Sequence, residues 1–261
     1  MTLTRGTGPL SRTPGPSNYT IEGPAHRILI EPSPKRVRVE VAGETVADTT
    51  AARTLHETGL LPVYYFPLDD VRSDLLRPTD HHTTCPFKGE ASYWSVVAGG
   101  RVEENLVWTY PEPLDEVAAI AGHAAFYLDR VDAVYEESVR LLGHPRDPYH
   151  RVDTLRSDRS VRVSVAGEVI AETSRPMAVF ETGMPPRWYI PRADVETDRL
   201  ERSDKVTVCP YKGVATYWSL RGGPADVAWE YAEPLPEATG LPDHLCFLGD
   251  DVTTDVVTPP R

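Results

Sequence analysis

The chain has 261 residues, which is about two domains of ordinary size. Its net charge is −12 and it contains no run of basic residues with interleaved aromatics, so the composition argues against nucleic acid as a partner. No apolar stretch approaches the roughly 20 residues that span a bilayer, and three cysteines do not form a secreted disulfide scaffold. We therefore expect a cytoplasmic protein without nucleic-acid or membrane partners.

The N-terminal segment 1–26 begins with Thr, Gly, Pro and Ser and carries no apolar signal region, so we expect a disordered or extended leader. A first domain is predicted to follow over residues 27–142. Within it, residues 36–47 alternate apolar and polar side chains around Ala42 and Gly43, a pattern typical of a β-hairpin.

The rest of this first domain also favours strands over helices. Strands are predicted at 63–66, 91–97, 106–110 and 124–128, and a helix of two turns at 114–120. The chain contains 25 prolines, and they fall between the apolar runs, which indicates many short strands.

The sequence then repeats itself. A proline-rich linker is predicted at 143–153, and a second domain at 154–258 repeats three blocks of the first at one constant offset. We therefore expect a mainly β fold: two homologous antiparallel-sheet domains with little helix, paired about an internal pseudo-twofold axis in a monomer. The matching blocks are Val37–Glu44 and Val161–Glu168, Glu57–Gly59 and Glu181–Gly183, and Cys85–Gly89 and Cys209–Gly213.

Longer strings around these blocks carry a family resemblance. They are Tyr64–Pro67, Cys85–Ser95 and Trp108–Pro113 in the first domain, and Tyr189–Pro191, Cys209–Ser219 and Trp229–Tyr231 in the second. Apart from the leader, nearly the whole chain resembles the tandem form of the family called domain of unknown function 427. The resemblance implies a small antiparallel β domain, with kinship to β-tent folds, and no established activity. A nucleotidyltransferase label sometimes accompanies that family, but this sequence lacks the Gly-Ser phosphate turn and the repeated carboxylate pair that such chemistry needs.

Cys85 and Lys88, with their copies Cys209 and Lys212, are the first candidates for chemistry. A lysine three residues from a thiol can lower the pKa of that thiol and so create a nucleophile. However, no histidine neighbours Cys209 in the sequence to act as a base. The alternative is a structural cysteine packed under a turn whose lysine faces water.

A metal site is not expected. His82 and Cys85 have a zinc-like separation, but a structural zinc needs four ligands, and the chain has no Cys-x-x-Cys pair. His81 and His82 have no counterparts in the second domain, and their role stays open. We predict no bound cofactor.

Ten aromatic residues that recur in both domains are candidates for the walls of a ligand pocket. Tyr93 and Trp94 are adjacent on a predicted strand and should face opposite sides of the sheet, whereas Trp108 and Tyr110 should share one face. Each ring either packs in the core or lines a small-molecule site. The set is Tyr65, Tyr93, Trp94, Trp108 and Tyr110, with Tyr189, Tyr217, Trp218, Trp229 and Tyr231.

Glu57 and its copy Glu181 complete the candidates. Glu57 lies close to apolar Leu55, and a buried carboxylate needs a partner, which Lys88 or Arg38 would supply. Such a pair is either a structural ion pair or a general acid–base pair.

Three functions are compatible with these patterns. The leading hypothesis is a module that binds a small polar or aromatic metabolite in a Tyr/Trp-walled pocket near the cysteine–lysine turn of each domain. The alternatives are an enzyme whose nucleophiles are Cys85 and Cys209, activated by Lys88 and Lys212, and a protein-interaction module.

Overall fold

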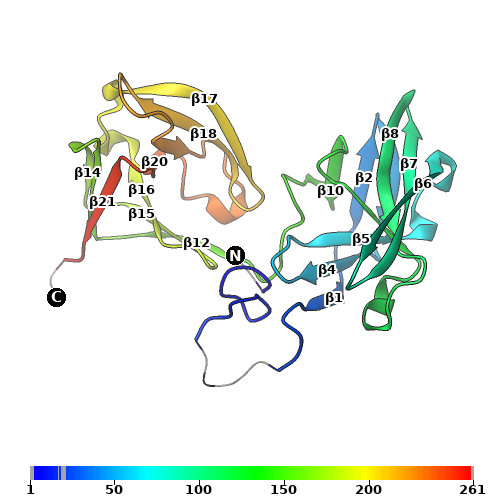
Figure 1. Cartoon of the computed structure of the whole chain (residues 1–261). Coiled ribbons are helices and arrows are strands. Elements are labelled where there is room, and N and C mark those ends of the chain that lie inside the picture. Colours follow the sequence, from blue (N-terminus) through cyan, green and yellow to red (C-terminus); the bar gives the residue numbers. More distant parts are fainter. Residues whose placement is uncertain (1–2, 17, 19–21, 260–261) are drawn as a thin grey trace. The chain divides into compact units, whose positions relative to one another are not determined.

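The computed structural model describes residues 3–16, 18 and 22–259, which divide into two compact units (Figure 1). The first unit extends to Asp147 and the second begins at Pro148. Both consist of antiparallel sheets joined by hairpins and short 3-10 turns, which confirms the predicted mainly β fold with two similar domains. Within the described residues, no helix is long and apolar enough to cross a membrane.

The first unit contains a seven-stranded and a four-stranded sheet. In spatial order, the larger sheet consists of β1 (Ile28–Pro32), β4 (Arg53–Glu57), β5 (Val63–Pro67), β9 (His123–Phe126), β8 (Arg101–Thr109), β7 (Gly89–Ala98) and β6 (Leu76–Cys85). The smaller consists of β11 (Val139–Arg140), β10 (Ala133–Glu136), β2 (Val37–Val41) and β3 (Glu44–Thr49). The 3-10 turns are η1 (Leu68–Asp70), η2 (Ser73–Leu75) and η3 (Asp115–Ile120).

The main core of this unit lies between its two sheets. The predicted hairpin is confirmed as β2 and β3, and it turns at Ala42 and Gly43, both of which have positive φ. The alternating valines of β2 are fully buried, and they belong to one cluster with Phe66 of β5 and Leu106 of β8. This hairpin therefore covers one face of the seven-stranded sheet.

A second apolar cluster covers the opposite face of that sheet. Side chains alternate along β5, so Phe66 lies in the main core while Tyr65 points into the second cluster. That cluster also contains Val117 and Ile120 of η3. The helix predicted here is instead two 3-10 turns merged across a kink at Val117, because a segment of six residues is too short to offset α-helix nucleation and gains its stability by packing these two side chains on the sheet.

The strands predicted from apolar patterns are present as β5, β7, β8 and β9. The ten-residue strand β6 was not predicted, because most of its side chains are exposed and polar and it contains Pro78. Since β6 lies at the edge of the sheet, it tolerates the missing N–H of a proline, and its pairing with β7 is interrupted between Pro78 and His82.

The second unit repeats this arrangement. Its larger sheet consists of β12 (Val152–Arg156), β15 (Met177–Glu181), β16 (Arg187–Pro191), β20 (His244–Phe247), β19 (Ala228–Glu230), β18 (Gly213–Leu220) and β17 (Leu200–Cys209). Its smaller sheet consists of β14 (Glu168–Thr173), β13 (Ser160–Val165) and β21 (Val252–Val257). The turns are η4 (Arg192–Asp194), η5 (Thr197–Arg199) and η6 (Pro236–Ala238). Two apolar clusters again cover the two faces of the larger sheet.

Candidate functional site

The end of strand β4 carries a buried carboxylate with two cationic partners. Glu57 is 6% exposed, and its Oε2 accepts a hydrogen bond from Nζ of Lys88. Its Oε1 accepts a hydrogen bond from Nε2 of His26 at 2.9 Å. Lys88 is therefore the partner that a buried Glu57 requires, while the other predicted partner, Arg38, pairs with Glu40 instead.

The Glu-Thr-Gly motif fixes His26 through the backbone as well as through the ring. Oγ1 of Thr58 accepts a hydrogen bond from the backbone N–H of Arg27 at 2.9 Å. The backbone N–H of Thr58 in turn donates to the carbonyl of Arg27 at 3.0 Å. Gly59 then turns the chain with a φ of +82°. The motif thus anchors the entry to β1 and places the preceding histidine over Glu57.

The Cys-Pro-Phe-Lys-Gly motif forms the turn between β6 and β7. Cys85 pairs with Gly89 across this hairpin, and the carbonyl of Lys88 accepts a hydrogen bond from the backbone N–H of Leu114 at 3.2 Å. Gly89 has a φ of +103°, and a Cβ at this position would lie 3.2 Å from the backbone oxygen of Glu112. Only glycine fits both constraints without strain. The motif therefore positions the ammonium of Lys88 next to the carboxylate of Glu57.

The same turn supplies an aromatic neighbour for the histidine. The rings of Phe87 and His26 stack with their centroids 3.7 Å apart and their planes at 12°. Phe87 is 41% exposed, which leaves part of the ring open to a further partner. We refer to His26, Glu57, Lys88 and Phe87 as the histidine cluster.

The second domain contains the same cluster. Oε1 of Glu181 accepts a hydrogen bond from Nε2 of His150 at 3.0 Å, and its Oε2 accepts one from Nζ of Lys212. Tyr211 takes the place of Phe87, with its ring centroid 4.1 Å from that of His150. Oγ1 of Thr182 accepts a hydrogen bond from the backbone N–H of Arg151, the residue after His150, at 2.9 Å. The duplication therefore retains a complete arrangement of side chains.

Electrostatics keep the carboxylate of the second cluster ionised. Burial by itself raises the pKa of Glu181, but the hydrogen bond from His150 and the charge of Lys212 outweigh burial and lower the pKa from 4.5 to about 2. A carboxylate that stays ionised can only accept hydrogen bonds. The histidine must therefore carry its proton on Nε2 when the ring is neutral, and Nδ1 is left as an acceptor.

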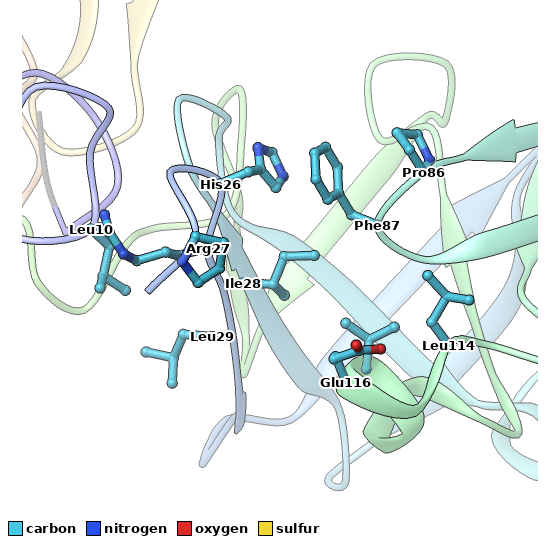
Figure 2. Close-up of a pocket in the computed structure, with 11 residues that line it drawn as sticks. Leu10, His26, Arg27, Ile28, Leu29, Pro86, Phe87, Leu114 and Glu116 are labelled. Carbon is cyan, nitrogen blue, oxygen red and sulfur yellow. The ribbon is translucent and has the colours of Figure 1, made fainter. Parts of the chain in front are cut away.

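The histidine of the first cluster lines a cavity of about 590 Å³. Figure 2 shows His26 and Phe87 at one end of this cavity, with Leu114 and Glu116 from the segment around η3 on another side. Leu10 of the N-terminal segment also contributes, and its carbonyl accepts a hydrogen bond from Oγ1 of Thr58 at 2.8 Å. The full lining is Leu10, Pro24, His26, Arg27, Ile28, Leu29, Pro86, Phe87, Leu114, Glu116 and Val117.

Comparison with known families agrees with this duplicated geometry. The family described as Domain of unknown function (DUF427) matches the chain twice, over residues 29–137 and 153–258. The chain belongs to the DUF427 family. None of the curated proteins compared with the chain matches it.

The tyrosines predicted to line a ligand pocket lie in the second apolar cluster of each DUF427 domain. Tyr65 and Tyr110 are 2% and 6% exposed, and burial raises the pKa of both phenols. Their copies, Tyr189 and Tyr231, are equally buried, and burial raises their pKa as well. Within the described residues, none of these four lines the 590 Å³ cavity.

Tyr93 and the tryptophans of the first DUF427 domain follow the predicted faces of the sheet. Tyr93 belongs to the same cluster as Tyr110, with Trp108 packed against it, whereas Trp94 packs into the main core. The predicted opposition of Tyr93 and Trp94 and the shared face of Trp108 and Tyr110 are therefore confirmed. Oγ1 of Thr83 forms a hydrogen bond with the hydroxyl of Tyr93 at 2.8 Å.

In the second DUF427 domain the half-buried aromatics have their own polar partners. Nε1 of Trp229 donates to the hydroxyl of Tyr189 at 3.1 Å, and the hydroxyl of Tyr217 forms a hydrogen bond with Thr207 at 3.0 Å. Trp218 lies on the other face of the sheet, where its Nε1 donates to Glu230 at 3.1 Å. These contacts account for the polar atoms of the three rings.

The cysteines of the two motifs are half-buried at the margin of the second cluster. Cys85 and Cys209 are free thiols that pack against the aromatic clusters of their domains. Lys88 and Lys212 direct their ammonium groups to Glu57 and Glu181. The third cysteine, Cys246, is fully buried, and burial raises its pKa to about 12.

The remaining histidine candidates lie on the exposed strand β6. The ring of His81 lies 4.5 Å from that of Tyr93, and Nδ1 of His82 lies 3.7 Å from Glu90. Within the described residues, no group of three or more His, Cys, Asp or Glu side chains is arranged to hold a metal ion.

Sequence reasoning missed His26 and His150. The predicted domains began at residues 27 and 154, so the first histidine fell in the leader and the second in the linker. The signal was nevertheless present, because His26-Arg27 and His150-Arg151 are separated by the same offset as Cys85 and Cys209.

Proposed function

We propose that the first DUF427 domain binds a small, planar metabolite in the 590 Å³ cavity beside the cysteine–lysine turn, and that the second domain binds a related molecule at His150. The observation that carries the proposal is the cavity itself: its walls are mostly apolar, and His26, Arg27 and Glu116 add a few polar groups. Small-molecule sites commonly combine these two features in a cavity of this size.

The stacked pair of His26 and Phe87 supports a planar ligand. Flat rings favour offset or edge contacts with other rings, and the partial exposure of Phe87 leaves area for such a contact. The cavity wall also shares Ile28 and Val117 with the cluster that holds Tyr65. Tyr65 would therefore lie in the layer behind the lining residues and fix their positions.

Titration of the full chain with small aromatic molecules tests this proposal. Aromatic fragments added to ¹⁵N-labelled protein are expected to shift the amide resonances of His26, Phe87 and Leu114 more than those elsewhere in the domain. Leu114→Trp should weaken binding at least tenfold, because the larger side chain fills the cavity.

Val139→Trp is the matched control, since Val139 is 57% exposed on β11 and outside the lining. If no fragment shifts the three resonances, or if Leu114→Trp binds as tightly as the unmodified protein, the proposed site is wrong.

The cysteine-dependent enzyme stays an alternative prediction. It needs Lys88 and Lys212 to act on the neighbouring thiols, whereas both ammonium groups pair with carboxylates. That pairing is an argument against activation of the thiols by these lysines. The interaction-module hypothesis likewise stays a prediction.

A further inference from the structure

We infer that the ligand of the histidine cluster is a neutral, planar molecule that donates an O–H or N–H hydrogen bond to Nδ1 of His26, and in the second domain to Nδ1 of His150. This inference rests on the proposed function, because it names the class of molecule that the cavity would hold.

The two nitrogens of each imidazole have different roles. In both domains Nε2 of the histidine points to a carboxylate oxygen, at 2.9 Å from Glu57 and 3.0 Å from Glu181. The second oxygen of each carboxylate is occupied by a lysine. Because the carboxylate accepts, the neutral imidazole keeps its proton on Nε2, and its lone pair is on Nδ1.

Nδ1 of His150 is deeply buried. The side chain of His150 is 5% exposed, and within the described residues its Nδ1 is buried without a hydrogen-bond partner. A buried polar atom left without a partner lowers stability, so such atoms are rare in folded proteins. The first domain carries the same side chain at the equivalent position, and there the histidine lines a cavity in which a ligand can supply the donor.

The shape of the cavity around His26 favours a flat ligand. In the first domain His26 lines the cavity, and within the described residues its Nδ1 makes no hydrogen bond. Its ring lies flat against Phe87, and the other walls include Ile28 and Leu114. A flat ligand can contact these walls while its donor reaches the imidazole.

The charges around the cavity favour a neutral ligand. When its imidazole is neutral, the cluster combines one ammonium and one carboxylate, and its formal charge is then zero. The cavity rim adds Arg27 and Glu116, which have opposite charges. A ligand with a formal charge would meet no net countercharge here, so a neutral donor is the better match.

Two isomeric probes test the inference. 3-Methylindole carries an N–H donor, whereas 1-methylindole has the same size and atoms but no donor. At pH 8.5 we expect the full chain to bind 3-methylindole about five- to tenfold more tightly, which corresponds to one hydrogen bond. Only 3-methylindole should shift the ¹⁵N resonance of the Nδ1 atoms in histidine-labelled protein.

His26→Gln is the matched variant for the first domain, because the NH₂ group of Gln can still donate to Glu57 while its carbonyl oxygen does not occupy the position of Nδ1. It should remove the preference between the isomers in that domain. The histidine resonances of the unmodified protein provide the same test without any variant.

The outcomes separate the two proposals. If both isomers bind in the cavity with equal affinity and neither shifts the Nδ1 resonance, the inference that the ligand donates a hydrogen bond to Nδ1 is wrong. The cavity would still be a binding site. If neither isomer binds, the proposed function and this inference both fail.

Discussion

At the scale of single residues, Glu57 and Glu181 are the centre of each domain's histidine cluster. Each carboxylate is largely buried and accepts hydrogen bonds from one lysine and one histidine. Removing one member of a buried ion pair is costly, because the remaining charge is left without compensation. Removal of a single charged member of the cluster should therefore destabilise the fold whether or not a ligand is bound.

Glu181→Gln should consequently destabilise the protein at pH 7 by about 3 kcal/mol. The variant leaves the ammonium of Lys212, whose side chain is 9% exposed, without its carboxylate. Urea denaturation followed by tryptophan fluorescence measures the free energy of unfolding. Glu168→Gln is the control: its side chain is 70% exposed and pairs with Arg199, so its loss should cost less than about 1 kcal/mol. Equal costs for the two variants would contradict a structural role for the buried pair.

The pKa of Glu181 predicts how the difference in stability between the unmodified protein and Glu181→Gln depends on pH. The folded protein holds the pKa at about 2, below its ordinary value of 4.5, so the unfolded chain takes up the proton first as the pH falls. The stability that the carboxylate contributes is complete above pH 4.5 and is lost as the pH approaches 2. Melting temperatures of the unmodified protein and Glu181→Gln, measured from pH 7 to pH 2.5, should therefore converge. A constant gap over this range would show that the carboxylate is not the titrating group.

At the scale of elements, two turns position the cluster. The Glu-Thr-Gly loop anchors the start of β1, and the Cys-Pro-Phe-Lys-Gly turn closes the hairpin of β6 and β7. Gly89 and its copy Gly213 have φ values of +103° and +109°, and in both cases a Cβ would lie 3.2 Å from a backbone oxygen. Backbone atoms cannot move aside as a flexible side chain can, so these glycines are required by the geometry.

Gly89→Ala should therefore destabilise the first domain by about 2 kcal/mol or more. Gly100→Ala is the matched control, because Gly100 also has a positive φ, +78°, but a Cβ there would meet no heavy atom within 4 Å. We expect Gly100→Ala to lower the free energy of unfolding by about 1 kcal/mol. The urea unfolding midpoints of the two variants measure these losses of stability. A smaller loss for Gly89→Ala than for Gly100→Ala would contradict the close approach to Glu112.

The elements also show what the sequence can predict and what it cannot. The hairpin of β2 and β3 was predictable because its valines alternate toward a core. Strand β6 was not, because an edge strand with exposed polar side chains has no apolar period. The partner of Glu57 was predicted as Lys88 or Arg38, since charge alone does not choose between two cations. The register of the β6–β7 hairpin places Lys88 rather than Arg38 beside Glu57, and strand register cannot be deduced from residue types alone.

At the scale of the whole molecule, the chain is two copies of one fold, each with its own apolar clusters. Among the residues that the structure describes, the clusters of the second unit draw on residues between Val152 and Val252, and those of the first on residues between Ile28 and Leu141. His26 and His150 stand just before the first strand of each larger sheet, which is why boundaries drawn from the strongest repeats excluded them. A histidine contributes no hydrophobic period, so only the repeat offset could reveal it.

This organisation predicts that the second unit folds by itself when the chain is cut before Pro148. A fragment of residues 148–261 keeps His150, the backbone of Arg151 that bonds Thr182, and Val152 of β12. A fragment of residues 154–261 lacks all three and leaves Glu181 without its histidine. We therefore expect the longer fragment to unfold cooperatively in urea, and the shorter one to lose about 3 kcal/mol of stability or to fail to fold. Chemical denaturation of the two fragments side by side is the measurement. Equal stabilities would mean that the segment carrying His150 contributes nothing to the domain, and a longer fragment that does not fold would mean that its own two clusters are not sufficient for stability.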